Sequence, residues 1–415
     1  MSQTRLHATQ VLYQVVHKQQ HLKQAMVQHV PKQLPEQDTA WIQHACYVSL
    51  RNHFSLQKRW QKFIEKPLKD KWLGELLTLS LAQKFHMSTP DHAIVDEAIK
   101  AAKKNKKSWA SGLLNKVLRL AMNDLDFKAE DEPAKYEHPQ WWIDLLKKDW
   151  PKHYQHILTA NNQKPPLWIR SRDPEKTYAG QPHPQIKTAW LLDDNKASTS
   201  SALLRGQFSV QDAAAQLAAE ILSPQAGEFI LDACAAPGGK SCHLLEKQIG
   251  IQLDILEKDA QRLKSIKQNL TRLNLHANRV IHGDATRPDQ WFAGKPYDKI
   301  LLDVPCSAAG VVRRNPDIKL SRKPEHLQQL TALQEKILQN IAPLLKPEGW
   351  LLYVTCSVFR AENERQIKKF LATNPDFSEV KLDYNEVVEC LHGVQIITGT
   401  NQMDGFYYCL LKKNP

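Results

Sequence analysis

Two cysteines and one aspartate stand where the sequence could support a thiol-dependent methylation. Asp303-Val304-Pro305-Cys306 and Thr355-Cys356-Ser357 each follow a short apolar segment that predicts a buried strand. Carbon 5 of a pyrimidine is too weak a nucleophile to attack a methyl sulfonium unaided, but a thiolate that adds to carbon 6 activates it. The reaction also needs an acid near ring nitrogen 3 and a base for the final elimination. Cys306, Cys356 and Asp303 are therefore the candidate catalytic residues.

The residue after Pro305 argues against methylation of an exocyclic amine. Enzymes with that activity typically carry Asp/Asn-Pro-Pro-aromatic at this point, where the aromatic ring stacks on the base. This chain has Cys306 after Pro305 and no aromatic residue there. A thiol in place of a ring favours chemistry at a ring carbon.

The remaining cysteines indicate neither disulfides nor a metal. The chain has 7 cysteines and no CxxC pair, which argues against a disulfide framework and against a zinc site. We therefore expect no metal and a reducing compartment. Buried cysteines usually behave as small hydrophobic residues, and we place four in that class: Cys46, Cys242, Cys390 and Cys409.

A glycine-containing loop indicates a nucleoside ligand. Residues 228–240 read Glu-Phe-Ile-Leu-Asp-Ala-Cys-Ala-Ala-Pro-Gly-Gly-Lys, which predicts a buried strand, a tight turn and a helix beginning near Ser241. Adjacent glycines let the backbone approach a ligand closely, and a helix start favours an anionic group. A phosphate-binding GxxxxGK[ST] loop would need glycine at Cys234, and a dinucleotide GxGxxG loop would need glycine at Ala236. A nucleoside ligand that carries a carboxylate remains, and S-adenosylmethionine fits this description. The residues expected to contact it are Cys234, Ala235, Ala236, Pro237, Gly238, Gly239 and Lys240.

Acidic residues end the next two predicted strands. Glu257 follows the strand Gln252–Leu256 and is placed to accept hydrogen bonds from both ribose hydroxyls. Asp284 follows the strand Arg279–His282, where a carboxylate could take the adenine amino group. Open α/β sheets bind their ligands at the carboxyl ends of their strands. We therefore expect these two residues to lie at the same edge as Asp303 and the two cysteines.

The alternation of helical and strand patterns predicts the fold class. From Gln207 onward it indicates a parallel sheet with helices on both faces, a Rossmann-like α/β domain at 206–415. The glycine loop and the two cysteine segments make it the candidate methyltransferase domain. Residues 141–205 are expected to form a small α+β linking module. A polar stretch at 123–140 reads as a linker.

The N-terminal third predicts an all-α bundle that binds a polyanion. Apolar residues recur at helical spacing throughout residues 1–126. The net charge of the chain is +12, and 20 basic minus 11 acidic residues give +9 for residues 1–130 alone. The run Lys103-Lys104-Asn105-Lys106-Lys107 is either a solvated turn or a contact to a nucleic-acid backbone.

The sequence contains no segment that predicts a membrane protein. No apolar run approaches the ~20 residues that a membrane-spanning helix needs. The N-terminus, Met-Ser-Gln-Thr-Arg-Leu-His, has no apolar signal core. We therefore expect a cytoplasmic protein.

Several motifs resemble known families. Val95-Asp96-Glu97-Ala98-Ile99 and Gly112-Leu113-Leu114-Asn115-Lys116-Val117-Leu118 resemble the NusB family of RNA-binding helical bundles. The glycine loop and the two cysteine segments, with Arg313-Arg314-Asn315-Pro316-Asp317 and Glu362-Asn363-Glu364, resemble the RNA 5-methylcytosine methyltransferases. A NusB-like domain joined to them is similar to the bacterial branch of that family, which acts on 16S rRNA.

The resemblance implies a set of roles. Cys356 would be the nucleophile, Cys306 a helper in product release, and Asp303 the acid that recognises the base. Residues 234–240, Glu257, Asp284 and Asp303 would contact S-adenosylmethionine. The target would be carbon 5 of cytosine 967 in 16S rRNA, reached through a covalent cysteine–carbon 6 adduct. A monomer is expected, with no DNA or membrane partner.

Two positions depart from the family pattern. Glu257 stands where members commonly carry Asp, although the longer side chain still reaches a ribose. In family members an Asn usually stands two residues after the arginine that corresponds to Arg170. This chain has Arg172 at that position, which leaves the substrate contacts of the linking module open.

Two other functions remain open. A DNA cytosine-5 methyltransferase would use Cys306 as its nucleophile, but the second cysteine at 356 and the basic helical region count against it. The other alternative is a non-catalytic RNA-binding assembly factor, and retention of Asp303 with both cysteines counts against that one.

Overall fold

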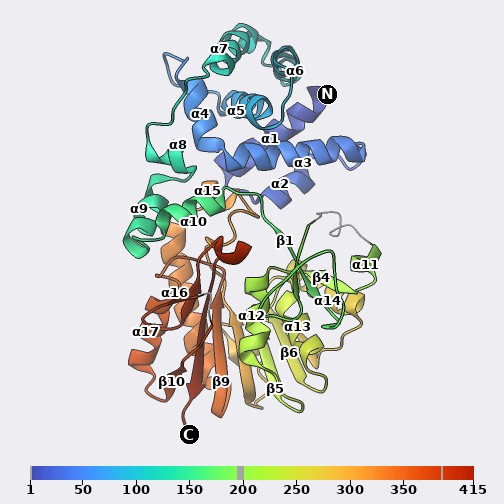
Figure 1. Ribbon diagram of the computed structural model, residues 1–415, viewed down its shortest axis with the longest axis vertical. Coiled ribbons are helices and arrows are strands. Elements are labelled where there is room, and N and C mark those ends of the chain that lie inside the picture. The colour runs from blue at the N-terminus through green and yellow to red at the C-terminus, as the bar shows by residue number, and fades with distance from the viewer. Residues whose placement is uncertain (1, 194–200, 385–386) are drawn as a thin grey trace. The chain divides into compact units, whose positions relative to one another are not determined.

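The computed structural model describes residues 2–193, 201–384 and 387–415 (Figure 1). The end of the expected module 141–205 includes 194–200, which lies outside the described residues. The chain forms two compact units, Met1–Lys164 with Val312–Lys323, and Pro165–Val311 with Pro324–Pro415. Among the described residues, no helix has the length and apolar character required to span a bilayer.

The first unit is a helical bundle built around α5 (Lys71–His86). Every residue of this helix from Trp72 to Gln83 is buried, and Leu73, Leu76 and Leu81 are fully buried. Asp70 caps the helix by accepting a hydrogen bond from the amide of Leu73. A helix that is apolar all round must be covered on all sides, and five helices contact it. These are α1 (Ser2–Lys18), α3 (Glu36–Arg51), α4 (His53–Gln61), α6 (Asp91–Lys104) and α7 (Ser111–Asn123).

Shorter elements complete this unit, and its all-α character is as expected. They are α2 (Leu22–His29), η1 (Ser108–Ala110), α8 (Glu132–Tyr136), α9 (Gln140–Asp149), α10 (Tyr154–Asn161) and α15 (Ile318–Ser321). Pro151 lies between two of these helices, because α9 ends before it and α10 begins after it.

The stretch 123–140 is not only a linker, and that interpretation was wrong in part. It contains α8, and Glu137 behind that helix is 8% exposed. The Glu137 carboxylate accepts hydrogen bonds from the amides of Phe54 (2.9 Å) and Ser55 (3.2 Å) at the start of α4. Glu137 therefore caps the start of α4 from a distant part of the chain.

The segment Val312–Lys323 packs within the first unit although its neighbours in sequence belong to the second. Lys319 is 1% exposed, and its ammonium donates to the carbonyl of Arg51 (2.7 Å) and to Oδ1 of Asn162 (2.9 Å). Burial lowers the pKa of Lys319 to about 7. Asp317 accepts a hydrogen bond from the amide of Leu22.

A small antiparallel sheet opens the second unit. Its strands lie in the order β2 (Gly180–Pro182), β3 (Ala189–Leu192), β1 (Leu167–Ser171) and β4 (Phe208–Val210), and α11 (Ser201–Leu204) precedes β4. Helix α12 (Ala213–Leu222) begins shortly after β4, with Gln211 and Asp212 between them. Asp212 caps α12 through the amide of Ala214.

A nine-stranded sheet forms the centre of the second unit. Its parallel part has the order β9-β8-β5-β6-β7. The bounds are β5 (Phe229–Ala233), β6 (Gln252–Glu257), β7 (Arg279–His282), β8 (Tyr297–Asp303) and β9 (Leu345–Thr355). These are the five strands that the sequence predicted, each within a few residues.

Helices cover both faces of this sheet, which confirms the expected fold class (Figure 1). Ile230 packs with α12, α13 (Gly239–Lys247) and α14 (Ala260–Leu273). Leu231, the next residue of β5, packs with α16 (Pro324–Ile341) and α17 (Glu364–Thr373) on the opposite face. Neighbouring residues of a strand point to opposite faces, so this continuous apolar strand is buried on both sides.

The sheet also has an antiparallel part that the sequence analysis did not foresee. β13 (Phe406–Lys413) pairs antiparallel with β9 and with β12 (Val394–Ile396), and it also pairs with β10 (Phe377–Val380). β11 (Val388–Glu389) pairs with β12. Short 3-10 turns lie at η3 (Pro288–Gln290), η4 (Ala342–Leu344) and η5 (Thr400–Gln402).

Candidate active site

The glycine loop turns tightly between β5 and α13. Gly238 has φ +93°, a left-handed conformation that side-chain-bearing residues rarely adopt, and a Cβ atom there would lie 3.3 Å from Cα of Ile266. The amide of Gly238 donates to the carbonyl of Ala235 (2.8 Å), which closes the turn. α13 then begins at Gly239, so its free N–H groups face the loop. The loop has the backbone expected of an anion-binding turn.

Glu257 lies beside this loop at the end of β6. The side chain is buried, and Oε2 accepts a hydrogen bond from the amide of Ala236 (3.1 Å). Oε1 accepts one from the amide of Asp259 (2.9 Å). The carboxylate therefore braces the loop and retains lone pairs that can accept hydrogen bonds from a hydroxyl-bearing ligand.

Asp284 lies at the end of β7, one strand further along the edge. Its Oδ1 accepts hydrogen bonds from the amide and the hydroxyl of Thr286, and its Oδ2 lies 2.7 Å from the ammonium of Lys258. Partial burial opposes ionisation, but these contacts outweigh it and hold the pKa of Asp284 at about 2. Asp284 is thus an ionised acceptor at neutral pH.

Asp303 at the end of β8 is paired with Lys240 from the first turn of α13. The Lys240 ammonium lies 2.5 Å from Oδ2 of Asp303. Burial disfavours the charged ammonium, but the neighbouring carboxylate outweighs it and raises the pKa of Lys240. Lys240, expected only as a cofactor contact, thus directs its charge toward the candidate catalytic aspartate.

Cys306 and Cys356 lie side by side at the ends of β8 and β9. Their Sγ atoms are 3.4 Å apart, and both are half-buried free thiols. The hydrogen bond with Cys356 and burial together raise the pKa of Cys306. Cys306 therefore keeps its proton at neutral pH and can donate it in a hydrogen bond to the sulfur of Cys356.

Glu362 holds the two cysteine loops together, a role that the sequence analysis missed. It is fully buried, and its Oε2 accepts hydrogen bonds from the hydroxyls of Ser307 and Ser357, both at 2.5 Å. Its Oε1 accepts from the amide of Ser307 (2.7 Å) and from Nε2 of Gln334 (3.1 Å). The residues that immediately follow Cys306 and Cys356 are thus anchored to one carboxylate.

Asn363 adds a second anchor on the Cys356 side. Its Oδ1 accepts from the hydroxyl of Thr355 (2.6 Å), and its Nδ2 donates to the carbonyl of Ser357 (3.0 Å). The bonds therefore bracket Cys356 on both sides. The Glu362-Asn363-Glu364 segment carried a family resemblance in sequence, but its contacts to the cysteine loops were visible only in the fold.

Asp232, a polar residue near the end of β5, is not among the predicted site residues. It is fully buried in β5, and burial raises its pKa to about 7. Oδ2 accepts a hydrogen bond from the hydroxyl of Ser241 (2.5 Å), while Oδ1 has no hydrogen-bond partner among the described residues. Its position one residue before the strand end was the available signal.

The register of the sheet brings the predicted residues to one edge. Ala233, the last residue of β5, is level with Leu256 and Leu302, and Asp303 is level with Val354. The glycine loop, Glu257, Asp303 and the cysteines therefore follow neighbouring strands. Cys234 has φ +63°, so its backbone makes the turn out of β5, and burial raises the pKa of its thiol. The described residues hold no group of three or more side chains suited to bind a metal.

Comparison with known families covers most of the chain. Residues 219–412 match the family described as "16S rRNA methyltransferase RsmB/F", and residues 2–123 match the "NusB family". Residues 138–172 match the family described as "Methyltr_RsmF/B-like, ferredoxin-like domain". The last match identifies the small linking module as ferredoxin-like.

Relatives and solved structures agree with these matches. Ribosomal RNA small subunit methyltransferase B from Vibrio cholerae is 41% identical, with 98% of this chain and 96% of the relative covered. The protein of the same name from Shewanella oneidensis is 39% identical over 98% of each chain. The crystal structure of PH0851 has a TM-score of 0.80 at 22% identity over 99% of each chain. A methyltransferase homolog from Pyrococcus horikoshii has a TM-score of 0.58 at 22% identity, with 68% of this chain and 97% of that one covered.

The solved structures support the fold of the chain. The sequence relatives cover almost the whole chain at identities near 40%. With the NusB match, the RsmB/F match and the clustered strand-end residues in agreement, the chain belongs to the RsmB family of ribosomal RNA small subunit methyltransferases.

Proposed function

We propose that this protein methylates carbon 5 of a specific cytosine in 16S rRNA, with S-adenosylmethionine as the methyl donor and a covalent cysteine–carbon 6 adduct on the path. By resemblance the target is cytosine 967. The observation that carries the proposal is the pair of thiols 3.4 Å apart beside the Asp303–Lys240 ion pair. A single buried thiol would have an ordinary packing role, but two adjacent thiols at a ligand-binding strand edge do not fit that role.

The residues at the edge fit S-adenosylmethionine. The free N–H groups at the start of α13 suit its carboxylate, and Glu257 and Asp284 present carboxylate oxygens to hydroxyl and amino groups. Residues 234–240 would surround the ligand together with Asp303. When bound, S-adenosylmethionine supplies an electrophilic methyl group.

The chain's own groups divide the remaining work. The Cys356 sulfur forms a bond to carbon 6, and the electron pair of the carbon 5–carbon 6 double bond becomes available at carbon 5. Negative charge develops toward ring nitrogen 3 as the sulfur adds, and the Lys240 ammonium, 2.5 Å from Asp303, supplies a proton that the Asp303 carboxyl passes to nitrogen 3. After carbon 5 has gained the methyl group, it gives its remaining proton to a water molecule that acts as the base. The double bond then re-forms, nitrogen 3 returns its proton to Asp303, and the Cys356 sulfur leaves carbon 6 as a thiolate.

The protonation of Cys306 supports this assignment of roles. The raised pKa of Cys306 keeps it a thiol at rest, which suits a hydrogen-bond donor to the nucleophile. Once the Cys356 sulfur is bonded to carbon 6 of the base, Cys306 lies next to the carbon 6–sulfur bond that must break. Cys306 would therefore assist the elimination.

A DNA cytosine-5 methyltransferase, with Cys306 as nucleophile, is the alternative. It would need a thiolate at the position where burial and Cys356 favour the thiol. A non-catalytic assembly factor would have no need of Glu362 joining the two cysteine loops.

The first unit is proposed to dock the RNA. Lys103, Lys104 and Lys106 are exposed, and they form no ion pair with any described residue, whereas Lys107 contacts Asp70. Trp109, close behind them, is 65% exposed. Free ammonium groups beside an exposed indole suit a phosphate backbone with an unpaired base. The 16S rRNA substrate would place the reaction in the cytoplasm.

The test is to map methyl groups. Purified protein is incubated with radiolabelled S-adenosylmethionine and total RNA from cells that lack the modification. The proposal predicts label in 5-methylcytosine of 16S rRNA at one position. Label at an exocyclic amine, or in DNA only, would overturn it.

A further inference from the structure

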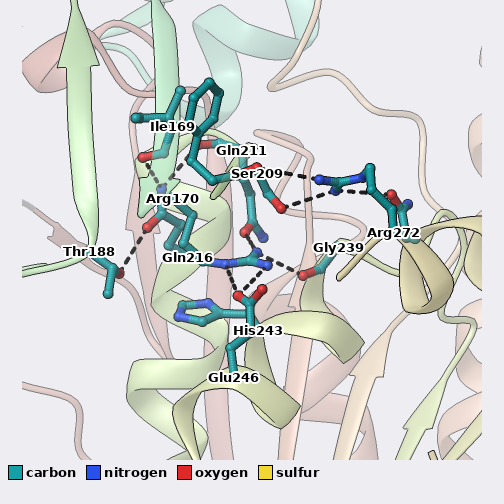
Figure 2. A network of polar contacts seen from close by, with 12 residues as sticks. Ile169, Arg170, Thr188, Ser209, Gln211, Gln216, Gly239, His243, Glu246 and Arg272 are labelled. Atoms are coloured by element: carbon teal, nitrogen blue, oxygen red, sulfur yellow. Dashed lines mark hydrogen bonds and ion pairs between the residues drawn. The ribbon is translucent and has the colours of Figure 1, made fainter. Parts of the chain in front are cut away.

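Arg170 is a buried arginine whose side chain leaves its own sheet. It lies in β1, level with Ala189 of β3 and Ser209 of β4, and it is 1% exposed. Its guanidinium extends between Gln211, Gly239 and Glu246, as Figure 2 shows. Two of these three residues belong to α13, the helix that begins at the glycine loop.

The contacts hold α13 at two points. Nη1 donates to the carbonyl of Gly239, the first residue of the helix, at 3.0 Å. Nε and Nη2 lie 2.9 and 2.8 Å from Oε2 of Glu246. Residues seven apart are separated by about two helical turns and share one face. Arg170 thus binds one face of α13 both at its start and two turns later.

Gln211 fixes the arginine from the other side. Its Oε1 accepts a hydrogen bond from Nη1 of Arg170, and its backbone N–H donates to the carbonyl of Trp168 in β1 (3.1 Å). Gln216 donates to the carbonyls of Ile169 and Gln211, both at 3.1 Å. The guanidinium is therefore set in a frame of hydrogen bonds from the small sheet and α12 (Figure 2).

Packing alone does not explain a buried ion pair between Arg170 and Glu246. Burying an ion pair costs several kcal/mol of desolvation, and apolar residues of similar volume often stabilise such a contact equally well. The bidentate fork of arginine offers a fixed geometry instead. In this structure the guanidinium holds the carbonyl of Gly239, the residue that follows Gly238. The left-handed conformation of Gly238 sets the direction of the amides of the loop.

We infer that Arg170 is a positioning residue for the methyl donor: it sets the start of α13, and through it the backbone amides of the glycine loop, without touching the ligand. The inference rests on the proposed function. It gives the ferredoxin-like module, through β1, a direct mechanical connection to the cofactor loop.

The test uses the full chain and isothermal calorimetry with S-adenosylmethionine, alongside the melting temperature. Arg170→Lys keeps the charge but cannot reach Gly239, Gln211 and Glu246 together. We expect it, and Glu246→Gln, to weaken binding about tenfold, which corresponds to about 1.4 kcal/mol. In steady-state assays the KM for S-adenosylmethionine should rise while kcat at saturating donor is retained.

Arg279→Gln is the matched control. Arg279, the first residue of β7, also pairs with a buried carboxylate, that of Asp254, at 3.0 Å from Nε, but three residues before Glu257 along β6. It should lower the melting temperature and leave the affinity unchanged.

The outcomes separate the two levels of the argument. If the wild-type protein binds no S-adenosylmethionine, the proposed function fails. If it binds, and Arg170→Lys and Glu246→Gln lower the melting temperature as Arg279→Gln does without changing affinity or KM, the positioning role is overturned. Should Arg170→Lys not fold, Glu246→Gln decides alone by the same criterion.

Discussion

The sulfur of Cys306 lies 3.4 Å from the sulfur of Cys356, although 50 residues separate them in sequence. The two loops that carry them follow adjacent parallel strands, and Glu362 accepts hydrogen bonds from the serine after each cysteine. The spacing of the thiols thus depends on a carboxylate that contacts neither sulfur. The predictions below test this arrangement and the surfaces that serve it.

Glu362→Gln should slow the covalent step. A glutamine keeps the volume but loses the charge that both serine hydroxyls share, and hydrogen bonds to charged groups are worth about 1.5–3 kcal/mol. In a Cys306→Ala background, the rate of protein–RNA adduct formation should fall about tenfold or more. Glu379→Gln is the control, because that side chain contacts His392 and Gly393 instead. Equal rates in both variants would exclude a positioning role for Glu362.

Glu257→Ala should weaken S-adenosylmethionine binding while the protein remains folded. Loss of a charge-assisted hydrogen bond to the ribose corresponds to about 1.5–3 kcal/mol, measured by calorimetry. Asp298→Asn provides the comparison, since Asp298 accepts from the amide of Phe229 at the far end of the sheet. Unchanged affinity in a folded Glu257→Ala protein would rule out the assignment.

Much of this site was predictable because strand ends and loop spacing are local features. The five parallel strands, the glycine loop, Glu257 and the two cysteine segments follow from short-range pattern alone. The antiparallel β13 was missed because its pairing with β9 joins residues that helices and loops separate.

Long-range hydrogen bonds account for the other omissions. Glu137 caps α4 from beyond 80 residues away, and Arg170 reaches α13 across 76 residues to Glu246. Neither contact leaves a periodic signal in sequence. Asp232 reads as one polar residue in an apolar strand, and only its burial near Asp303 distinguishes it.

The lysines at the C-terminal end of α6 and just after it should account for part of the salt dependence of RNA binding. Each phosphate contact to single-stranded RNA contributes a slope of about 0.7 in log affinity against log salt. Lys103, Lys104 and Lys106 changed together to Gln should reduce the slope by about 2 in filter-binding titrations. Lys100→Gln should change it less than Lys104→Gln, because Lys100 is already paired with Asp96 and Glu97. Identical slopes for the wild type and the triple variant would remove this surface from the docking site.

Asp232 should make the protein less stable as the pH rises toward neutrality. Its folded pKa is raised to about 7 from an ordinary value of 3.8, so its contribution to stability is fully present below about pH 4 and is lost as the pH passes through about 7. Asp232→Asn cannot ionise. The melting temperature of the wild type relative to this variant should therefore fall between pH 5 and pH 8. Parallel melting curves across that range would contradict the raised pKa.

The two thiols of the site act one after the other. Cys356 must attack before methyl transfer, so Cys356→Ala should abolish both activity and any covalent link to RNA. Cys306 acts when the carbon 6–sulfur bond breaks, so Cys306→Ala should permit methylation and stall release. A purely packing role for both thiols predicts no adduct in either variant and little loss of rate.

The most direct measurement is a denaturing gel of each variant after incubation with S-adenosylmethionine and 16S rRNA. A slow-migrating protein–RNA band confined to Cys306→Ala, with a methylated base in the trapped RNA, is the predicted result. The same band from Cys356→Ala, and its absence from Cys306→Ala, would contradict the account.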